Sequence, residues 1–234
     1  MSVLLKYSVV YIIGGTFGYL TEFFFRRAVH KKWINPGFLV GPNLPLYGLG
    51  LCLLFAVASA DYSFISSPLW RNVFIIVAIA LSMTAIEYVT GLLFIKGMHV
   101  KLWDYSDRKG NIQGIICPLF SLIWAAIGAF YYFVLHKHVQ SAALGVVAHP
   151  SYGYFLGMYF GIMLVDVCYS FRVTDKIRKW AKERRLVVRY EELKETVKAK
   201  TAVLKEKYSF LLPLKSNRDL KHDLDDYEKN NQKP

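Results

Sequence analysis

Residues 72–95 read NVFIIVAIALSMTAIEYVTGLLFI, and Glu87 is the only acidic or basic side chain among them. A helix rises about 1.5 Å per residue and the hydrocarbon core of a bilayer is about 30 Å thick, so this run predicts a membrane-spanning helix. The whole chain agrees with that prediction, because 54% of its 234 residues are hydrophobic. We therefore expect an integral membrane protein rather than a soluble domain.

Other apolar runs flank this one on both sides. Together they predict five spans, near residues 3–25, 44–61, 72–95, 114–135 and 153–171. The second is the weakest, because Tyr47, Gly48 and Gly50 shorten its apolar part. The predicted fold class is an all-α membrane protein with about five transmembrane helices, whose transmembrane domain covers residues 1–171.

The orientation follows from the distribution of Lys and Arg, which are retained on the cytoplasmic side of a membrane. The connections after the first and third spans hold eight of them: Arg26, Arg27, Lys31, Lys32, Lys96, Lys101, Arg108 and Lys109. The opposite side holds only Lys6, Arg71 and Lys137. Five spans with the N-terminus outside and the C-terminus in the cytoplasm satisfy every connection.

The segment after the last span is strongly basic. Residues 172–234 carry 18 Lys and Arg against 11 Asp and Glu. Apolar residues recur every three or four positions over 172–213, with a phase shift near Arg184 and Arg185, which predicts a cytoplasmic amphipathic helix. Residues 214–234 are polar and predict a disordered tail. Beside a bilayer this charge favours anionic lipid headgroups over nucleic acid, and the helix could also self-associate in a homo-oligomer.

Two cytoplasmic loops are similar to each other. Residues 30–48 read HKKWINPGFLVGPNLPLYG, and residues 99–120 read HVKLWDYSDRKGNIQGIICPLF. Each has His, Lys and Trp, then Asn, Gly and Pro before the next span, which suggests a duplicated helical hairpin. Irregular backbone at membrane depth is stable only where protein buries it or it lines a wet cavity, so we interpret both loops as re-entrant or interfacial.

Three carboxylates lie within predicted spans, where ionisable groups are costly and therefore informative. They are Glu22, Glu87 and Asp166, all in the cytoplasmic half of their spans. If the odd-numbered spans pack together, these residues form one acidic cavity that could bind a cation, relay protons or hold an arginine. Glu22 could instead pair with Arg26 at i, i+4, and the other two could be structural counter-ions.

The loops contribute five further candidates for substrate or ion binding, namely Asn35, Trp103, Asp104, Tyr105 and Asn111. Trp103 and Tyr105 also suit aromatic anchoring at the membrane interface. The two asparagines could equally cap the segments that follow them.

Several kinds of chemistry have no motif in this chain. It contains no G-x-x-x-x-G-K-[ST] phosphate-binding loop and no G-x-S-x-G nucleophile elbow. The histidines lack the helical spacing of metal ligands, except for His136 and His138 at the outer end of a predicted span, which we interpret as interfacial polarity and not as a zinc site. We therefore predict neither a metal nor a cofactor. Whether the protein is an enzyme stays open.

A set of motifs occurs in one order along residues 11–171: Gly18-Tyr19-x-x-Glu22, Asn35-Pro36-Gly37-Phe38, Glu87-Tyr88-x-Thr90-Gly91, Trp103-Asp104-Tyr105-Ser106, Asn111-x-x-Gly114, Trp124 and Asp166-x-x-x-Ser170. In these motifs the chain resembles the CmpB-type ABC transporter permease family of bacteria. Pro36 departs from the resemblance, since it stands where the family pattern leads us to expect an arginine. The resemblance implies a multi-span protein of a bacterial cell membrane and a separate nucleotide-binding subunit as partner.

Three functions are compatible with these features. The leading hypothesis is a permease component with an acidic cavity open to the cytoplasm and an unknown substrate. The alternatives are a membrane-embedded enzyme that acts on a lipid headgroup and a non-catalytic scaffold whose basic tail recruits a partner.

Overall fold

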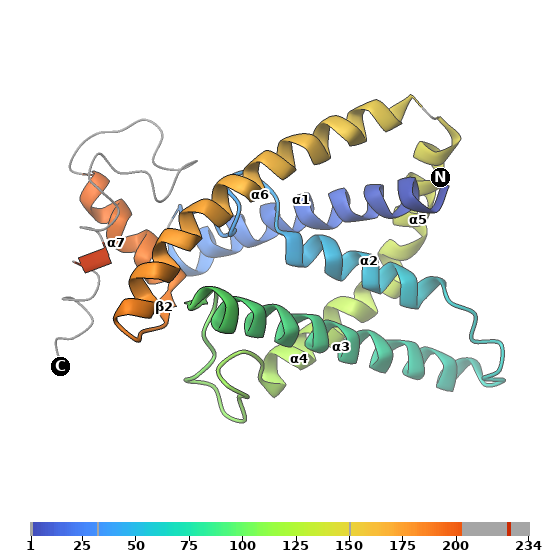
Figure 1. The fold of residues 1–234 in the computed structure, drawn as a ribbon. Coiled ribbons are helices and arrows are strands. Elements are labelled where there is room, and N and C mark those ends of the chain that lie inside the picture. The colour runs from blue at the N-terminus through green and yellow to red at the C-terminus, as the bar shows by residue number, and fades with distance from the viewer. Residues whose placement is uncertain (1, 32, 150, 203–223, 226–234) are drawn as a thin grey trace. The chain divides into compact units, whose positions relative to one another are not determined.

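The structure is a computed structural model that describes residues 2–31, 33–149, 151–202 and 224–225 (Figure 1). Helices make up nearly all of its regular structure. In chain order the elements are α1 (Ser2–His30), α2 (Pro45–Ser59), α3 (Pro68–Leu92), the π-helix η1 (Leu93–Met98), β1 (Val100–Lys101), α4 (Pro118–Phe130), the π-helix η2 (Tyr131–Leu135), α5 (His136–Ala148), α6 (Tyr152–Glu183), β2 (Val188–Arg189) and α7 (Tyr190–Ala202).

Four helical stretches are long and apolar enough to cross a membrane. They are Val3–Val29, Pro68–Met98, Pro118–Ala148 and Tyr152–Glu183. Helix α2 is apolar but has 15 residues, which span about 22 Å and fall short of a typical bilayer core. The all-α membrane fold class is confirmed, whereas the count of five spans and their orientation stay predictions.

The chain divides into two compact units, which we describe separately. Unit 1 comprises Met1–Gly18, Asn43–Thr90 and Tyr105–Ile162, and unit 2 comprises Tyr19–Pro42, Gly91–Asp104 and Met163–Pro234. Helices α1 and α6 each contribute residues to both units. The predicted boundary at residue 171 is untested, and the predictions for 203–213 and for all of 214–234 except 224–225 lie outside the described residues.

Close helix contacts through small residues organise unit 1. A Cβ added at Gly14 of α1 would lie 2.7 Å from the carbonyl oxygen of Tyr47 in α2. A Cβ at Gly128 of α4 would overlap Ile79 Cγ2 in α3. Small residues at these positions let helices approach closely, as is usual for helices that pack within a membrane.

Apolar side chains are exposed along the outside of unit 1. On α6 they include Tyr154, Phe155, Met158 and Ile162, and further examples lie on α3 and α4. A surface of this kind is expected where a helix faces lipid instead of water.

Unit 2 has a second hydrophobic core. Its centre is formed by the fully buried Val100, Ile177, Val188 and Leu193. Strands β1 and β2 pair in parallel, and Val188 N–H donates to the carbonyl of His99 at 2.9 Å. The periodicity shift near Arg185 falls where α6 has ended and the backbone adopts a left-handed φ of 55° before β2.

Charge is concentrated in unit 2. It contains 24 of the 29 Lys and Arg residues, and the five in unit 1 are Lys6, Arg71, Arg108, Lys109 and Lys137. Unit 1 also holds only three acidic residues, Asp61, Glu87 and Asp107. Unit 1 is therefore the part whose composition suits hydrocarbon.

Candidate functional site

Asn35 shapes the irregular loop that follows α1 in unit 2. Its Nδ2 donates to the carbonyls of Leu39 and Val40 at 3.0 and 2.9 Å, and its Oδ1 accepts from Gly37 N–H at 2.8 Å. The side chain is buried, and an asparagine that bonds neighbouring backbone in this way replaces the hydrogen bonds of regular structure. Asn35 therefore has a structural explanation in this loop.

Asp166 holds the far end of the same loop. It projects from α6, and its two oxygens accept N–H bonds from Val40 at 2.9 Å and Gly41 at 2.7 Å. Ser170, one helical turn later, donates its hydroxyl to Asp166 Oδ1 at 3.1 Å. Hydrogen bonds to an ionised acceptor are among the stronger ones in proteins, so these donors suit a charged carboxylate.

Lys194 of α7 holds the near end of the loop. Its ammonium donates to the carbonyls of Asn35 at 2.8 Å and Gly37 at 3.4 Å, and it lies 4.9 Å from the centre of the Tyr190 ring. The residue is 3% exposed. Burial, with a smaller effect of the nearby Arg26, lowers the pKa of Lys194 to about 7.

These contacts form a clamp, which we define as Lys194, loop residues 35–42 and Asp166. The lysine engages carbonyl groups of the loop, and the aspartate engages its N–H groups. The clamp thus joins α7 to α6 through one short segment of backbone.

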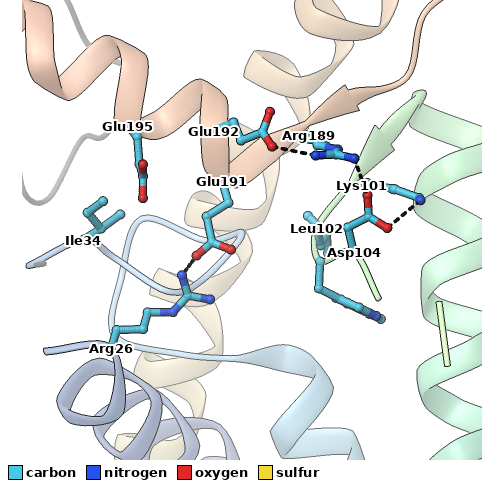
Figure 2. Close-up of a pocket in the computed structure, with 10 residues that line it drawn as sticks. Arg26, Ile34, Lys101, Leu102, Asp104, Arg189, Glu191, Glu192 and Glu195 are labelled. Atoms are coloured by element: carbon cyan, nitrogen blue, oxygen red, sulfur yellow. Dashed lines mark hydrogen bonds and ion pairs between the residues drawn. The ribbon is translucent and has the colours of Figure 1, made fainter. Parts of the chain in front are cut away.

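A cavity of about 320 Å³ lies next to the clamp in unit 2 (Figure 2). Glu191, Glu192 and Glu195 reach it from α7, and Arg189 reaches it from β2. The rest of its lining is formed by Arg26, Ile34, Lys101, Leu102, Trp103 and Asp104.

Most of the charged groups around this cavity form ion pairs. Asp104 accepts from Lys101 at 2.8 Å and from Arg189 at 3.0 Å, and Arg189 also contacts Glu192 at 2.9 Å. Arg26 pairs with Glu191 and, at 3.0 Å, with Glu22. A ligand in this cavity would have to compete with these ion pairs, and the described residues contain no cluster of His, Cys, Asp or Glu able to hold a metal.

A separate polar cluster lies in unit 1 around Glu87 of α3. Tyr105 donates its hydroxyl to Glu87 Oε1 and Trp124 donates its indole N–H to Oε2, both at 3.1 Å. Tyr105 stacks on Phe120 at 4.2 Å, and Trp124 packs edge-on against Tyr47 at 5.8 Å. Burial raises the pKa of Tyr105, so its hydroxyl keeps its proton.

Asn111 plays a role in the second loop that resembles that of Asn35 in the first. Its Nδ2 donates to the carbonyls of Ser106 and Arg108 at 3.2 and 2.8 Å, and its Oδ1 accepts from Gly114 N–H at 2.9 Å. Each loop then leads into a helix that starts with proline, at Pro45 and Pro118. This likeness agrees with the suggested duplication, which stays a prediction.

The structure sorts the eight candidate residues into two groups. Unit 2 contains Glu22, Asn35, Trp103, Asp104 and Asp166, whereas unit 1 contains Glu87, Tyr105 and Asn111. The suggested pairing of Glu22 with Arg26 is present. The single acidic cavity shared by Glu22, Glu87 and Asp166 stays a prediction.

Lys194, which hydrogen-bonds the loop in the clamp, is not among the residues predicted from the sequence. It is one of many lysines after residue 171, and the helical pattern alone does not set it apart. Its one distinguishing signal is its position directly beside Leu193, on the apolar face formed by Tyr190, Leu193 and Val197.

Apolar helices of spanning length define the class of this chain, which is a multi-pass membrane protein. The chain belongs to the CmpB family, described as "putative ABC-transporter type IV", which matches residues 9–171. The resemblance inferred from the motifs is therefore confirmed, and the protein is a transport-related membrane protein. No curated protein and no solved structure matches it.

Proposed function

We propose that this chain is the membrane-spanning component of an ABC-type transporter in a bacterial cell membrane, with its C-terminus in the cytoplasm. The family assignment over residues 9–171 supports this role. Because the sequence has no phosphate-binding P-loop, the energy of ATP hydrolysis comes from a separate nucleotide-binding subunit.

The clamp of unit 2 is the observation that carries the proposal. A permease driven by a separate ATPase needs a part outside the membrane that is firmly connected to a spanning helix. Lys194 on α7 and Asp166 on α6 form four hydrogen bonds to backbone groups of the same loop. A displacement of α7 by a partner subunit is therefore passed to α6 through a contiguous network of hydrogen bonds.

Copurification from native membranes tests whether the chain binds a separate nucleotide-binding subunit. The tagged chain is solubilised in mild detergent, and its associated proteins and lipids are identified by mass spectrometry. We expect a P-loop ATPase in stoichiometric amount. Enrichment of a modified lipid without an ATPase would favour the headgroup enzyme instead, and a partner with no ATPase motif would favour the scaffold.

Variants of the clamp test the transmission of movement. In the complex with the ATPase, Lys194→Met should lower the rate of ATP hydrolysis or of transport several-fold. The complex should stay assembled, because the variant removes only the hydrogen bonds between α7 and the loop. Lys182→Met is the matched control, since Lys182 is an exposed lysine near the end of α6. Equal activity of both variants would contradict the proposed role of the clamp.

Labelling of intact cells tests the orientation. In a cysteine-free background, Ser66→Cys, which lies between α2 and α3, should react with an impermeant reagent from outside. Lys182→Cys should react only after the cells are opened. The reverse result would place the C-terminus outside.

The basic segment after the last span is proposed to contact anionic lipid headgroups. Exposed cations there include Arg172, Lys176, Arg178 and Lys182. Each basic residue near an anionic surface contributes about 1 kcal/mol, and the effect weakens as salt rises. The purified chain should therefore retain anionic lipid at low salt and exchange it for neutral lipid at high salt.

A further inference from the structure

Glu87 lies in the most apolar of the helical stretches that could cross a membrane. Within that stretch, Pro68–Met98, an 18-residue window has a mean hydropathy of 2.1, and Glu87 itself is 3% exposed. A charged side chain in such a place is expensive unless a cation or several strong hydrogen bonds compensate for it.

The partners of Glu87 are neutral. Among the described residues, its oxygens meet the hydroxyl of Tyr105 and the indole N–H of Trp124, and no Lys, Arg or His forms an ion pair with it. Tyr47 and Cys117 are the other titratable groups of this cluster, and both interact electrostatically with Tyr105. Neither brings a positive charge, so among the described residues only the two neutral donors would offset the charge of an ionised Glu87.

The hydrogen-bond geometry allows a proton on this carboxyl. An indole N–H can only donate, so Glu87 Oε2 must be an acceptor. A phenol hydroxyl can either donate or accept, so Oε1 can carry a proton and donate it to Tyr105 Oη over the same 3.1 Å. In that arrangement both oxygens of a neutral carboxylic acid have a partner.

We propose that Glu87 is a proton-binding site in unit 1 and that its carboxyl is protonated at neutral pH. The carboxylate takes one proton on Oε1, and the neutral acid then links α3 to α4 and to the loop that holds Tyr105. Release of the proton leaves a buried charge that the donors Tyr105 and Trp124 offset only in part, which favours entry of water or a cation into the site. A change in packing around Tyr105 and Trp124 is thereby coupled to uptake or release of a proton.

The contrast with Asp166 strengthens this assignment. Asp166 accepts two backbone N–H groups and a serine hydroxyl. A backbone N–H can only donate, so both oxygens of Asp166 accept from the backbone, whereas one of the two partners of Glu87 is a hydroxyl that can also accept. The two carboxyls therefore differ in the chemistry of their donors.

Infrared spectroscopy of the purified full-length chain in lipid nanodiscs tests the proposal. A protonated carboxyl has a C=O stretching band well separated from that of a carboxylate. At neutral pH exposed Asp and Glu are ionised, since their pKa values are about 4. We expect such a band in the wild-type protein and its loss in Glu87→Gln, whereas the matched variant Asp107→Asn, whose aspartate is exposed, should retain it.

Two further measurements keep the test decisive if Glu87→Gln fails to fold. Incorporation of isotopically labelled glutamate into the wild-type chain should shift the same band, which assigns it to a glutamate. Trp124→Phe removes the donor to Oε2 and should move the band without abolishing it. A wild-type spectrum with no protonated glutamate at neutral pH overturns the proposal, and this result would leave the transport role untouched because the two do not depend on each other.

Discussion

Units 1 and 2 hold their buried polar groups in different ways. In unit 1, Glu87 is surrounded by neutral side-chain donors and aromatic rings, and only five Lys and Arg residues belong to the whole unit. In unit 2, Asp166 and Lys194 bind backbone groups of one loop, and ion pairs such as Arg189 with Asp104 line the adjacent cavity. Neutral partners suit a region in hydrocarbon, whereas charge and backbone contacts suit a region near water.

The largest expected effect comes from removing the carboxylate of unit 2. Asp166→Ala leaves the N–H groups of Val40 and Gly41 without their acceptor and should lower the free energy of unfolding by about 3–5 kcal/mol. Thermal unfolding of the purified chain in detergent measures the loss. The control Asp107→Ala, at a side chain 69% exposed, should change stability by less than about 0.5 kcal/mol.

A smaller effect is expected from helix packing in unit 1. Gly14→Ala places a Cβ against the carbonyl of Tyr47, which cannot move as a side chain can, and should cost about 1–3 kcal/mol. Gly157→Ala on α6 meets no atom within 4 Å and should be neutral or stabilising by up to about 1 kcal/mol, because alanine favours helix. Equal melting points for the two variants would mean that α1 and α2 do not pack as described.

The third prediction concerns pH and unit 2. An unfolded lysine has a pKa of about 10.4, whereas that of Lys194 is about 7 in the folded protein. Between these values the unfolded chain binds more protons, so stability should rise with pH, by at most about 1.4 kcal/mol per pH unit. Below pH 7 both states are protonated, so this lysine no longer makes stability vary with pH and the cost of burying its charge is at its largest.

Comparison of the wild-type protein with Lys194→Met isolates this effect, since other titrations are common to both. The difference in melting temperature between the two should change from pH 7 to pH 9 in favour of the wild type. A difference that does not vary with pH would show that the ammonium of Lys194 is well solvated.

The smallest expected effect is the coupling between the two carboxyls. Glu87 and Asp166 have separate partners in separate units, so Glu87→Gln and Asp166→Asn should lower stability additively within about 0.5 kcal/mol. A shared acidic cavity predicts a larger coupling. Unfolding of the two single variants and the double variant distinguishes the two arrangements.

The apolar runs of the sequence predict most of the fold, because long uncharged stretches have few alternatives to a spanning helix. The run at 72–95 corresponds to Pro68–Met98, and the run at 153–171 corresponds to the first part of α6. The run at 44–61 corresponds to α2, whose 15 helical residues are fewer than a simple span needs. Hydropathy alone does not locate the ends of α2, which begins at Pro45 and is capped by Ala60.

The site was predictable only in part. An ionisable side chain is energetically costly within a membrane span, so the sequence alone singles out Glu87 and Asp166. In the structure each of them has several hydrogen-bond partners. The identity of those partners depends on tertiary contacts between residues up to 159 positions apart, such as Lys194 with Asn35. No local motif identifies those partners. The helical periodicity places Lys194 on the apolar face formed by Tyr190, Leu193 and Val197, which indicates burial but not contact with Asn35.

The π-helix η1 has a consequence for how this sequence tolerates deletion. A π segment contains one residue more per turn than an α-helix, as if a residue had been inserted into an older helix. Removing one residue from Leu93–Met98 would convert the π segment to regular α geometry, and the wide turn would absorb the loss. Val100 would then keep its place opposite Val188 in the β1–β2 pair. A one-residue deletion is therefore expected to be tolerated better here than within α3, where it would rotate the residues that follow by about 100°.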